Sequence, residues 1–132
     1  MRFSLLVSSP PADSYGSDPA LQFARAVVRS EHELHRVFFY GDGVFHGSAL
    51  AVVPRDRPDT AEQWAALAAE HQVDLVLCSA SATRRGVLDR DEAERRAHPA
   101  ASAHAAFALS GLGQLADTYL LGDRIVTFGG TR

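Results

Sequence analysis

The sequence predicts an α/β fold: a single three-layer domain over residues 1–132 with a five-stranded, mainly parallel sheet between helices. Short runs rich in β-branched and aromatic residues alternate with helical patterns, the order typical of a sheet built with right-handed crossovers. The run Val37–Tyr40 is continuously apolar, as expected for a strand covered on both faces. The chain has 132 residues, 46 % of them hydrophobic and 22 % charged, which suits one core; it contains no repeat or linker.

The first half of the chain predicts two strands and a helix. Phe3–Val7 is a short apolar run that ends in a Ser-Pro segment, so we expect a buried strand followed by a loop. Asp18 followed by Pro19 is typical of a helix N-cap and first helical residue, and the apolar spacing continues to about Ser30. Val37–Tyr40 is the second predicted strand.

A helix and a third strand follow. Either Asp59 or Thr60 is expected to cap a helix whose apolar stripe carries Trp64 and reaches His71. We expect Trp64 to lie in the core. Val73–Leu77 is the third predicted strand.

The last third of the chain is less regular. The charged stretch Asp89–Arg96 predicts a short solvated helix with internal ion pairs, and the Ala-rich stretch Pro99–Ala106 is ambiguous. Phe107–Leu109 predicts a short fourth strand. A helix is expected to open at Ser110–Gly113 and to continue to about Leu121, and Asp123–Phe128 is the fifth predicted strand.

Composition excludes several classes of function. The net charge of −3 does not suit a protein that binds nucleic acid directly through its phosphates. All thirteen cationic residues are Arg, which excludes a Schiff-base lysine, a P-loop lysine and a lysine general base. The six histidines lack metal-site spacing, so we expect no metal. The apolar N-terminal run is too short for a signal peptide or a membrane span, and we expect a cytoplasmic protein.

Cys78 is the only cysteine, so the chain cannot form an internal disulfide. It follows the third predicted strand, at the sheet edge where reactive groups collect in open α/β folds. A turn of small, polar residues comes after it, so the thiol could be approached from solvent. Arg84 and Arg85 follow, and guanidinium and backbone N–H groups favour a thiolate. Such a thiolate could attack sulfur and carry a persulfide, for which one thiol is enough. The alternative is an inert core cysteine, which is common among free cysteines.

Three other features of the sequence are site candidates. His46 follows the second strand and could assist proton transfer or favour the thiolate, although a solvated loop histidine is the simpler interpretation. The pairs Gly41/Gly43 and Gly111/Gly113 each follow a strand and could cradle a phosphate. Neither pair completes a nucleotide-binding motif, and tight turns explain both.

Four strings in order along the chain resemble the DsrE/TusD sulfurtransferase subunits, and two shorter N-terminal matches agree with them. The strings are Val37–Val44, Cys78–Ala93 (with Arg84-Arg-Gly-Val and Asp89-x-x-Glu92-Ala), Phe107–Gly113 and Asp123–Phe128, with Met1–Phe3 and Gln22–Ala24. The resemblance covers nearly the whole chain.

The resemblance implies a DsrE-like (flavodoxin-like) fold and a cytoplasmic sulfur-relay subunit in which Cys78 accepts sulfur as a persulfide and passes it on. It implies no metal, nucleotide or flavin cofactor. TusD-like members work with TusB-like and TusC-like sister subunits as a dimer of heterotrimers. They take sulfur from a TusA-like donor and pass it to a TusE-like acceptor, towards 2-thiouridine at the tRNA wobble position. DsrE-like members use the same architecture in dissimilatory sulfur oxidation. A homo-oligomer is the other assembly expected.

Three hypotheses follow. The first is a persulfide-carrying sulfurtransferase subunit that uses Cys78, with Arg84, Arg85 and His46 as supporting residues. The arginines act either on the thiolate or in partner docking. The second is a non-catalytic assembly or regulatory subunit of the same fold, in which Cys78 is buried. The third is a flavodoxin-like module that binds a phosphorylated small molecule through one of the glycine pairs.

Overall fold

The computed structural model describes residues 1–11, 18–52, 55 and 59–129. Strands and helices alternate along most of the chain, as the sequence predicts. In chain order the elements are β1 (Arg2–Val7), α1 (Pro19–Arg29), β2 (Glu33–Phe39), the 3-10 helix η1 (Gly41–Gly47), α2 (Thr60–His71), β3 (Asp74–Cys78), α3 (Ser79–Arg84), α4 (Arg90–Arg95), β4 (Ala108–Ser110), α5 (Leu112–Leu121) and β5 (Arg124–Phe128).

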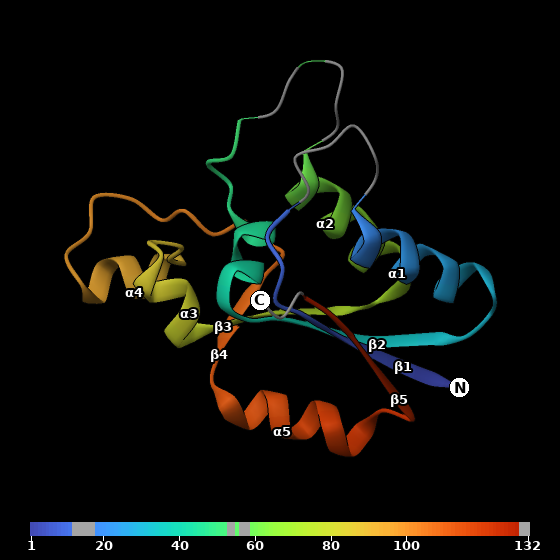
Figure 1. Ribbon diagram of the computed structural model, residues 1–132. Helices are drawn as coiled ribbons and strands as arrows, with labels where there is room; N and C mark the ends of the chain where they lie inside the picture. Colours follow the sequence, from blue (N-terminus) through green and yellow to red (C-terminus); the bar gives the residue numbers. More distant parts are fainter. Residues whose placement is uncertain (12–17, 53–54, 56–58, 130–132) are drawn as a thin grey trace.

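The five strands form one sheet in the order β4-β3-β2-β1-β5, and every neighbouring pair is parallel. Helices α1 and α2 cover one face of this sheet and α5 lies across the other, which gives the predicted three layers (Figure 1). Because all strands run the same way, their carboxyl ends meet at one edge. Helix α3 and η1 lie at that edge (Figure 1).

The larger part of the core lies between the sheet and helices α1 and α2. Phe39 and Trp64 are fully buried there and meet edge to face, with ring centroids 5.3 Å apart. Each large side chain buried in this way contributes about 1.5–3 kcal/mol to folding. The expectation that Trp64 is a core residue is confirmed. Other fully or nearly fully buried members include Leu5, Val7, Leu21, Ala24, Val37, Val44 and Leu77.

Side-chain caps determine where the first two helices start. Asp18 has extended backbone angles, and its carboxylate accepts a hydrogen bond of 3.1 Å from the amide two residues on, with Pro19 first in α1. Asp59 caps α2 in the same way at 2.9 Å, so Asp59 is the cap and Thr60 is the first helical residue.

Strand β2 differs from its prediction at both ends. It begins at Glu33 instead of Val37, because its first residues pair with β1 in the register Arg2↔Glu33. A search for apolar runs misses this first part of β2, because it contains charged residues. Tyr40 lies just beyond the strand, although its amide still donates to the carbonyl of Val7 at 2.9 Å.

The polar segments of the second half behave largely as expected. In α4 the carboxylate of Glu92 pairs with both Arg95 and Arg96, so the prediction of a solvated helix with internal ion pairs is confirmed. The ambiguous stretch 99–106 forms no helix, and its Ala103 makes an isolated antiparallel bridge with Ser48.

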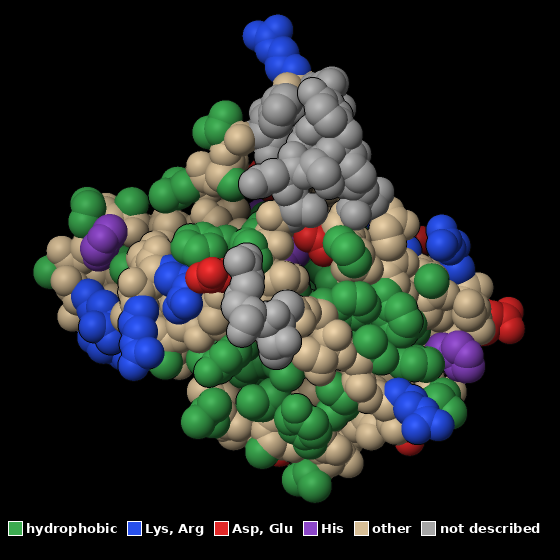
Figure 2. Space-filling model, viewed as in Figure 1, with side chains coloured by type: hydrophobic (Ala, Val, Ile, Leu, Met, Phe, Trp, Pro, Cys, Tyr) green, Lys and Arg blue, Asp and Glu red, His purple; other side chains and the backbone are tan. Residues whose placement is uncertain are grey.

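Exposed apolar side chains gather on the outer side of α5, in the lower part of Figure 2. They are Leu112, Tyr119, Leu120 and Leu121, with exposed fractions between 50 % and 80 %. Within the described part of the chain, no helix has both the length and the apolar character needed to cross a bilayer.

Candidate functional site: the carboxyl end of strand β3

Cys78 is the last residue of β3 and also the N-cap of α3. Strand β3 forms because Asp74–Cys78 is an apolar run after its first residue. The small residues that follow allow the chain to turn directly into a helix. The structure therefore replaces the expected turn after Cys78 with α3. In the sheet, Cys78 pairs with Ser110 of β4.

The Cys78 side chain is only 3 % exposed. With Phe38 and Val76 it forms a small apolar cluster on the α5 face of the sheet, and Leu6 and Leu115 pack against that cluster. We call these three residues the thiol cluster. The expectation that the small residues after Cys78 leave the thiol open to solvent is wrong, because the side chain points towards α5 and not towards the loop edge. Burial is the feature that the second hypothesis requires.

Arg84 and Arg85 both lie at the end of α3, but they have different surroundings. Arg84 is exposed. Arg85 donates from Nε to Asp42 Oδ1 at 2.9 Å and from Nη1 to the carbonyl of Ser81 at 3.1 Å. The Arg85 guanidinium thus joins α3 to η1 and already has a carboxylate as its partner. Asp42 was not predicted as part of the site, although its place in the turn after β2 indicates this edge.

His46 lies on the other face of the sheet from the thiol cluster. Its ring packs against Phe39, with centroids 5.3 Å apart, while Phe38 on the adjacent position belongs to the thiol cluster. The structure therefore does not bring His46 to Cys78. The simpler expectation of a solvated loop histidine is also wrong, because the side chain is 0 % exposed.

Both ring nitrogens of His46 have partners. Trp64 Nε1 donates to Nδ1 at 3.2 Å, so Nε2 carries the hydrogen and donates to the carbonyl of Ser9 at 3.1 Å. Burial lowers the pKa of His46, and the carboxylate of Asp18, 3.8 Å from Nε2, opposes that shift. This neutral imidazole ties η1 to α2 and to the segment after β1. It is a structural histidine in a satisfied hydrogen-bonding environment.

The first glycine pair, Gly41/Gly43, has a structural explanation. A Cβ on Gly43 would lie 2.0 Å from the carbonyl oxygen of Val7, so η1 can approach β1 this closely only with glycine there. Gly41 has a φ of +56°, the left-handed region that glycine adopts most readily. Gly111 and Gly113 have open space around them. In the described ranges no group of three His, Cys, Asp or Glu side chains could hold a metal ion.

Two residues with hydroxyl groups, which the sequence did not single out, lie at the carboxyl ends of the strands on either side of β3. Ser110 pairs with Cys78 in the parallel ladder, so both side chains are on one face. Tyr40 has extended backbone angles and continues the alternation of β2, which places it on the face of Phe38; its side chain is 48 % exposed. A signal for both residues existed, since each directly ends a predicted strand at the same edge.

This arrangement suits sulfur chemistry better than acid–base chemistry. No described base is hydrogen-bonded to Cys78, and His46, the one candidate base that the sequence suggested, is on the opposite face. Exchange at a sulfur–sulfur bond needs only an attacking thiolate and a leaving thiolate. A single thiol at a strand terminus meets that requirement once it can be reached.

Comparison with known proteins agrees with the predicted resemblance. A family model described as the DsrE/DsrF-like family matches residues 1–128. The chain is 42 % identical to the protein named DsrE of Allochromatium vinosum over 129 residues, which cover 98 % of this chain and 99 % of that protein. It is 41 % identical over 128 residues to the sulfurtransferase TusD of Salmonella paratyphi B, covering 97 % of this chain and all of that one.

A solved structure supports the fold. The ychN protein from E. coli superposes with a TM-score of 0.68 at 21 % identity, covering 97 % of this chain and 100 % of that chain. At this identity the likeness concerns the fold alone. The predicted α/β architecture is confirmed, and its sheet is parallel throughout instead of mainly parallel.

Proposed function

This chain belongs to the DsrE/DsrF-like family, and on that premise we propose that it is a sulfurtransferase subunit that carries sulfane sulfur on Cys78 as a persulfide. The observation that carries the proposal is the position of the only thiol of the chain, at the carboxyl end of β3 in a sheet whose strand ends meet at one edge. Full-length relatives named DsrE and TusD at 42 % and 41 % identity support it. In this proposed function, residues 1–132 act as a single domain.

The transfer consists of two exchange steps at sulfur. The Cys78 thiolate attacks the outer sulfur of a donor persulfide, a Sγ–S bond forms, the donor S–S bond breaks, and the donor leaves as a thiolate. An acceptor thiolate then attacks the outer sulfur on Cys78, and the Cys78 thiolate leaves. Electrons and sulfur atoms balance without a metal, nucleotide or flavin. Of the two arginines, the exposed Arg84 is proposed for partner docking, since Arg85 is engaged by Asp42.

We assign this relay to the 2-thiolation of wobble uridine in tRNA. The partners are TusB-like and TusC-like sister subunits, or further copies of this chain, with a TusA-like donor and a TusE-like acceptor in the cytoplasm. The TusD relatives support this assignment. The exposed apolar side chains on α5 support an oligomer, because monomeric proteins seldom leave such a surface uncovered. The net charge of −3 supports contact with carrier proteins instead of tRNA itself.

Dissimilatory sulfur oxidation is the second candidate, and the 42 % identity to DsrE of Allochromatium vinosum favours it. Deletion of the coding sequence in the native host separates the two. Loss of 2-thiouridine from total tRNA supports the first function, and normal 2-thiouridine with impaired oxidation of stored sulfur supports the second.

Incubation of the purified chain with a low-molecular-weight persulfide tests the chemistry. We expect the wild-type protein to gain one sulfur atom by intact mass and Cys78→Ser to gain none. Wild-type protein alkylated beforehand on Cys78 serves as a second negative control. Urea unfolding of Cys78→Ser shows whether the variant is folded. A folded Cys78→Ser that still gains sulfur contradicts the proposal, and a wild-type protein that never gains it supports the non-catalytic alternative.

A further inference from the structure

We infer that α5 is the cover of the Cys78 thiol and that Arg36 is the positioning residue that holds this cover closed. The role in sulfur transfer rests on the proposed function, whereas the cover itself can be tested without it. A persulfide carrier must bring its sulfur against a donor and an acceptor. Cys78 is 3 % exposed, so part of the structure must move before either reagent can reach it.

The surroundings of the thiol leave α5 as the element that can move. Phe38 and Val76 of the thiol cluster belong to β2 and β3, which are both paired on two sides, so displacing either strand would break the sheet ladder. Helix α3 starts at Cys78 itself. Leu115 of α5 packs against the cluster on the face of the sheet that α5 covers. Helix α5 begins two residues after Ser110, which pairs with Cys78 in the sheet.

Few apolar contacts hold α5 to the sheet. Thr118 is its one buried residue among ten, whereas Leu112, Tyr119, Leu120 and Leu121 are all at least half exposed. Segments with few buried contacts open locally at a small fraction of the free energy of global unfolding. Gly111, directly before the helix, lies in open space, with no atom within 4 Å of the position of a Cβ, so nothing packs against the start of α5 at this point.

Two guanidinium groups donate to α5: Arg2 Nη1 reaches the carbonyl of Leu121 at the exposed carboxyl end at 3.2 Å, and the buried Arg36 holds the middle of the helix. Arg36 is 7 % exposed, and its Nη1 donates to the carbonyl of Gln114 at 3.2 Å and to Thr118 Oγ1 at 3.3 Å. Its Nη2 donates to Asp74 Oδ2 at 2.8 Å, which anchors the same group to β3. Arg36 therefore joins the cover to the strand that ends in Cys78. Its loss shifts the balance towards the open form, because two charge-assisted hydrogen bonds to α5 are removed.

The test is alkylation of the native protein with iodoacetamide, followed by intact mass. Cys78 is the only thiol, so the rate reports this site alone. We expect Arg36→Met to react about ten- to a hundredfold faster than the wild type without denaturant. Because the Asp74 side chain is 60 % exposed, water can replace its lost partner, and the variant is expected to fold. Thr118→Val removes one acceptor of Arg36 and is expected to give a smaller increase.

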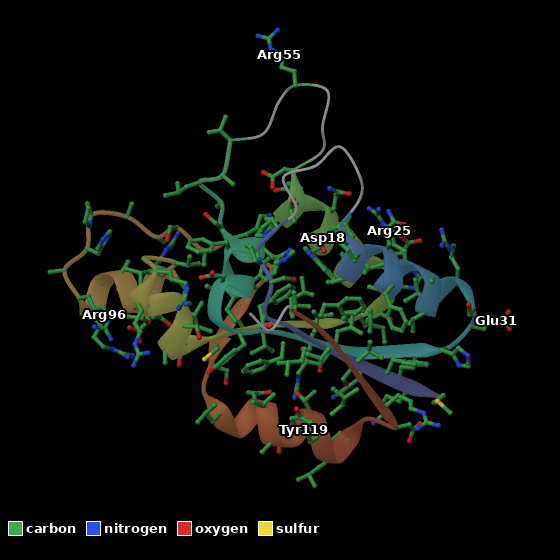
Figure 3. The ribbon with its side chains drawn as sticks, in the orientation of Figure 1. Asp18, Arg25, Glu31, Arg55, Arg96 and Tyr119 are labelled. Carbon is green, nitrogen blue, oxygen red and sulfur yellow. The ribbon has the colours of Figure 1, made fainter. Side chains whose placement is uncertain are left out.

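Arg25→Met is the matched control. Arg25 Nη2 donates to Gln63 Oε1 at 3.0 Å between α1 and α2, on the face of the sheet opposite α5 (Figures 1 and 3). It is expected to leave the alkylation rate unchanged. Arg36→Lys, which keeps a cation, is expected to fall between wild type and Arg36→Met.

Urea dependence separates local opening from global unfolding. If alkylation occurs through a local opening of α5, its rate changes little at low concentrations of urea. If it occurs through the unfolded state, the rate rises steeply with urea, because global unfolding exposes far more surface. A steep dependence in every variant, or equal rates for wild type and Arg36→Met, overturns the cover. Faster alkylation without any gain of sulfur from a persulfide leaves the cover standing and contradicts the proposed function. If the protein gains sulfur but the alkylation rate does not respond to the Arg36 and Thr118 substitutions, the proposed function stands and the cover is overturned.

Discussion

At the residue scale, two side chains predicted to meet at one sheet edge lie on opposite faces. Cys78 lies with Phe38 below the sheet, and His46 lies with Phe39 above it. Phe38 and Phe39 are neighbours in one strand, so their side chains alternate. The thiol is thus separated from the only histidine considered for it. The chemistry proposed for Cys78, exchange at sulfur, needs no base in the site.

The pH dependence of stability should report His46. Burial lowers its pKa below the ordinary value of 6.5, so below that pH the unfolded chain binds a proton more readily than the folded chain. The free energy of unfolding is therefore expected to be highest above pH 6.5 and to fall as the pH decreases from there towards the lowered pKa of the folded protein. Urea unfolding at pH ~7.5 and ~5.5 measures the difference.

The control for that experiment is His46→Gln, which cannot titrate. This variant is less stable at all pH values, since the bonds from Trp64 and to Ser9 are altered. Its loss between the two pH values is expected to be smaller than that of the wild type. His35, whose pKa burial also lowers, titrates in both proteins and cancels in the comparison. An equal loss in both proteins contradicts the assignment to His46.

At the element scale, the helices differ in what holds them. Helices α1 and α2 have aspartate caps and bury several side chains in the main core, including Leu21 and Trp64. Helix α5 has a glycine N-cap without a side-chain hydrogen bond and a single buried residue, Thr118. Helix α5 therefore relies on the hydrogen bonds from the buried Arg36 and, at its exposed carboxyl end, from Arg2, and it is the least firmly attached helix on the sheet faces.

The cap of α2 gives a prediction for an element that does not touch Cys78. Asp59→Ala removes the 2.9 Å hydrogen bond from the carboxylate to the amide of Ala61. The expected loss of stability is about 1 kcal/mol, within the range of ~0.5–2 kcal/mol for such caps, measured by urea unfolding. Asp59→Asn keeps an acceptor and should lose less. No loss in Asp59→Ala means that the cap contributes nothing to stability.

At the scale of the whole molecule, the two faces of the sheet are covered unequally. Among the described elements, two helices cover one face and α5 covers the other, and α5 carries the exposed leucine and tyrosine side chains on its outer side (Figures 1 and 2). Tyr119 is 55 % exposed and lies on α5, away from the α1 side marked by Arg25 (Figure 3). The proposed partner subunits have an apolar surface to contact here.

Association through α5 can be tested with one substitution. Leu120 is 80 % exposed, so Leu120→Glu removes little from the core and places a charge on the apolar surface. We expect wild-type protein to sediment as an oligomer and Leu120→Glu as a smaller species with unchanged stability. Glu31→Ala is a suitable control, since Glu31 is exposed at the end of α1, away from α5. A wild type that stays monomeric at all concentrations indicates that sister subunits are needed, and identical sedimentation of two oligomeric proteins places the interface elsewhere.

Short-range signals in the sequence determined most of the elements and the place of the thiol in the chain. Apolar runs located the strands, the pair Asp18-Pro19 located the start of α1, and the end of the third run placed Cys78 at the carboxyl edge. These features depend on residues within a few positions of one another. Strand β2 was located only in part, because its first residues are polar and are held by pairing with β1.

Tertiary packing decided the environment of the site. The face on which His46 lies, the burial of Cys78 and the pairing of Arg85 with Asp42 all depend on elements that meet only in the folded chain. The hydrogen bond from Arg36 to Thr118 joins residues 82 positions apart. No local pattern encodes such a contact, because it exists only once β2 and α5 pack together. The sequence therefore placed the thiol proposed for sulfur transfer at the end of a strand, and the three-dimensional arrangement determined which residues bury it.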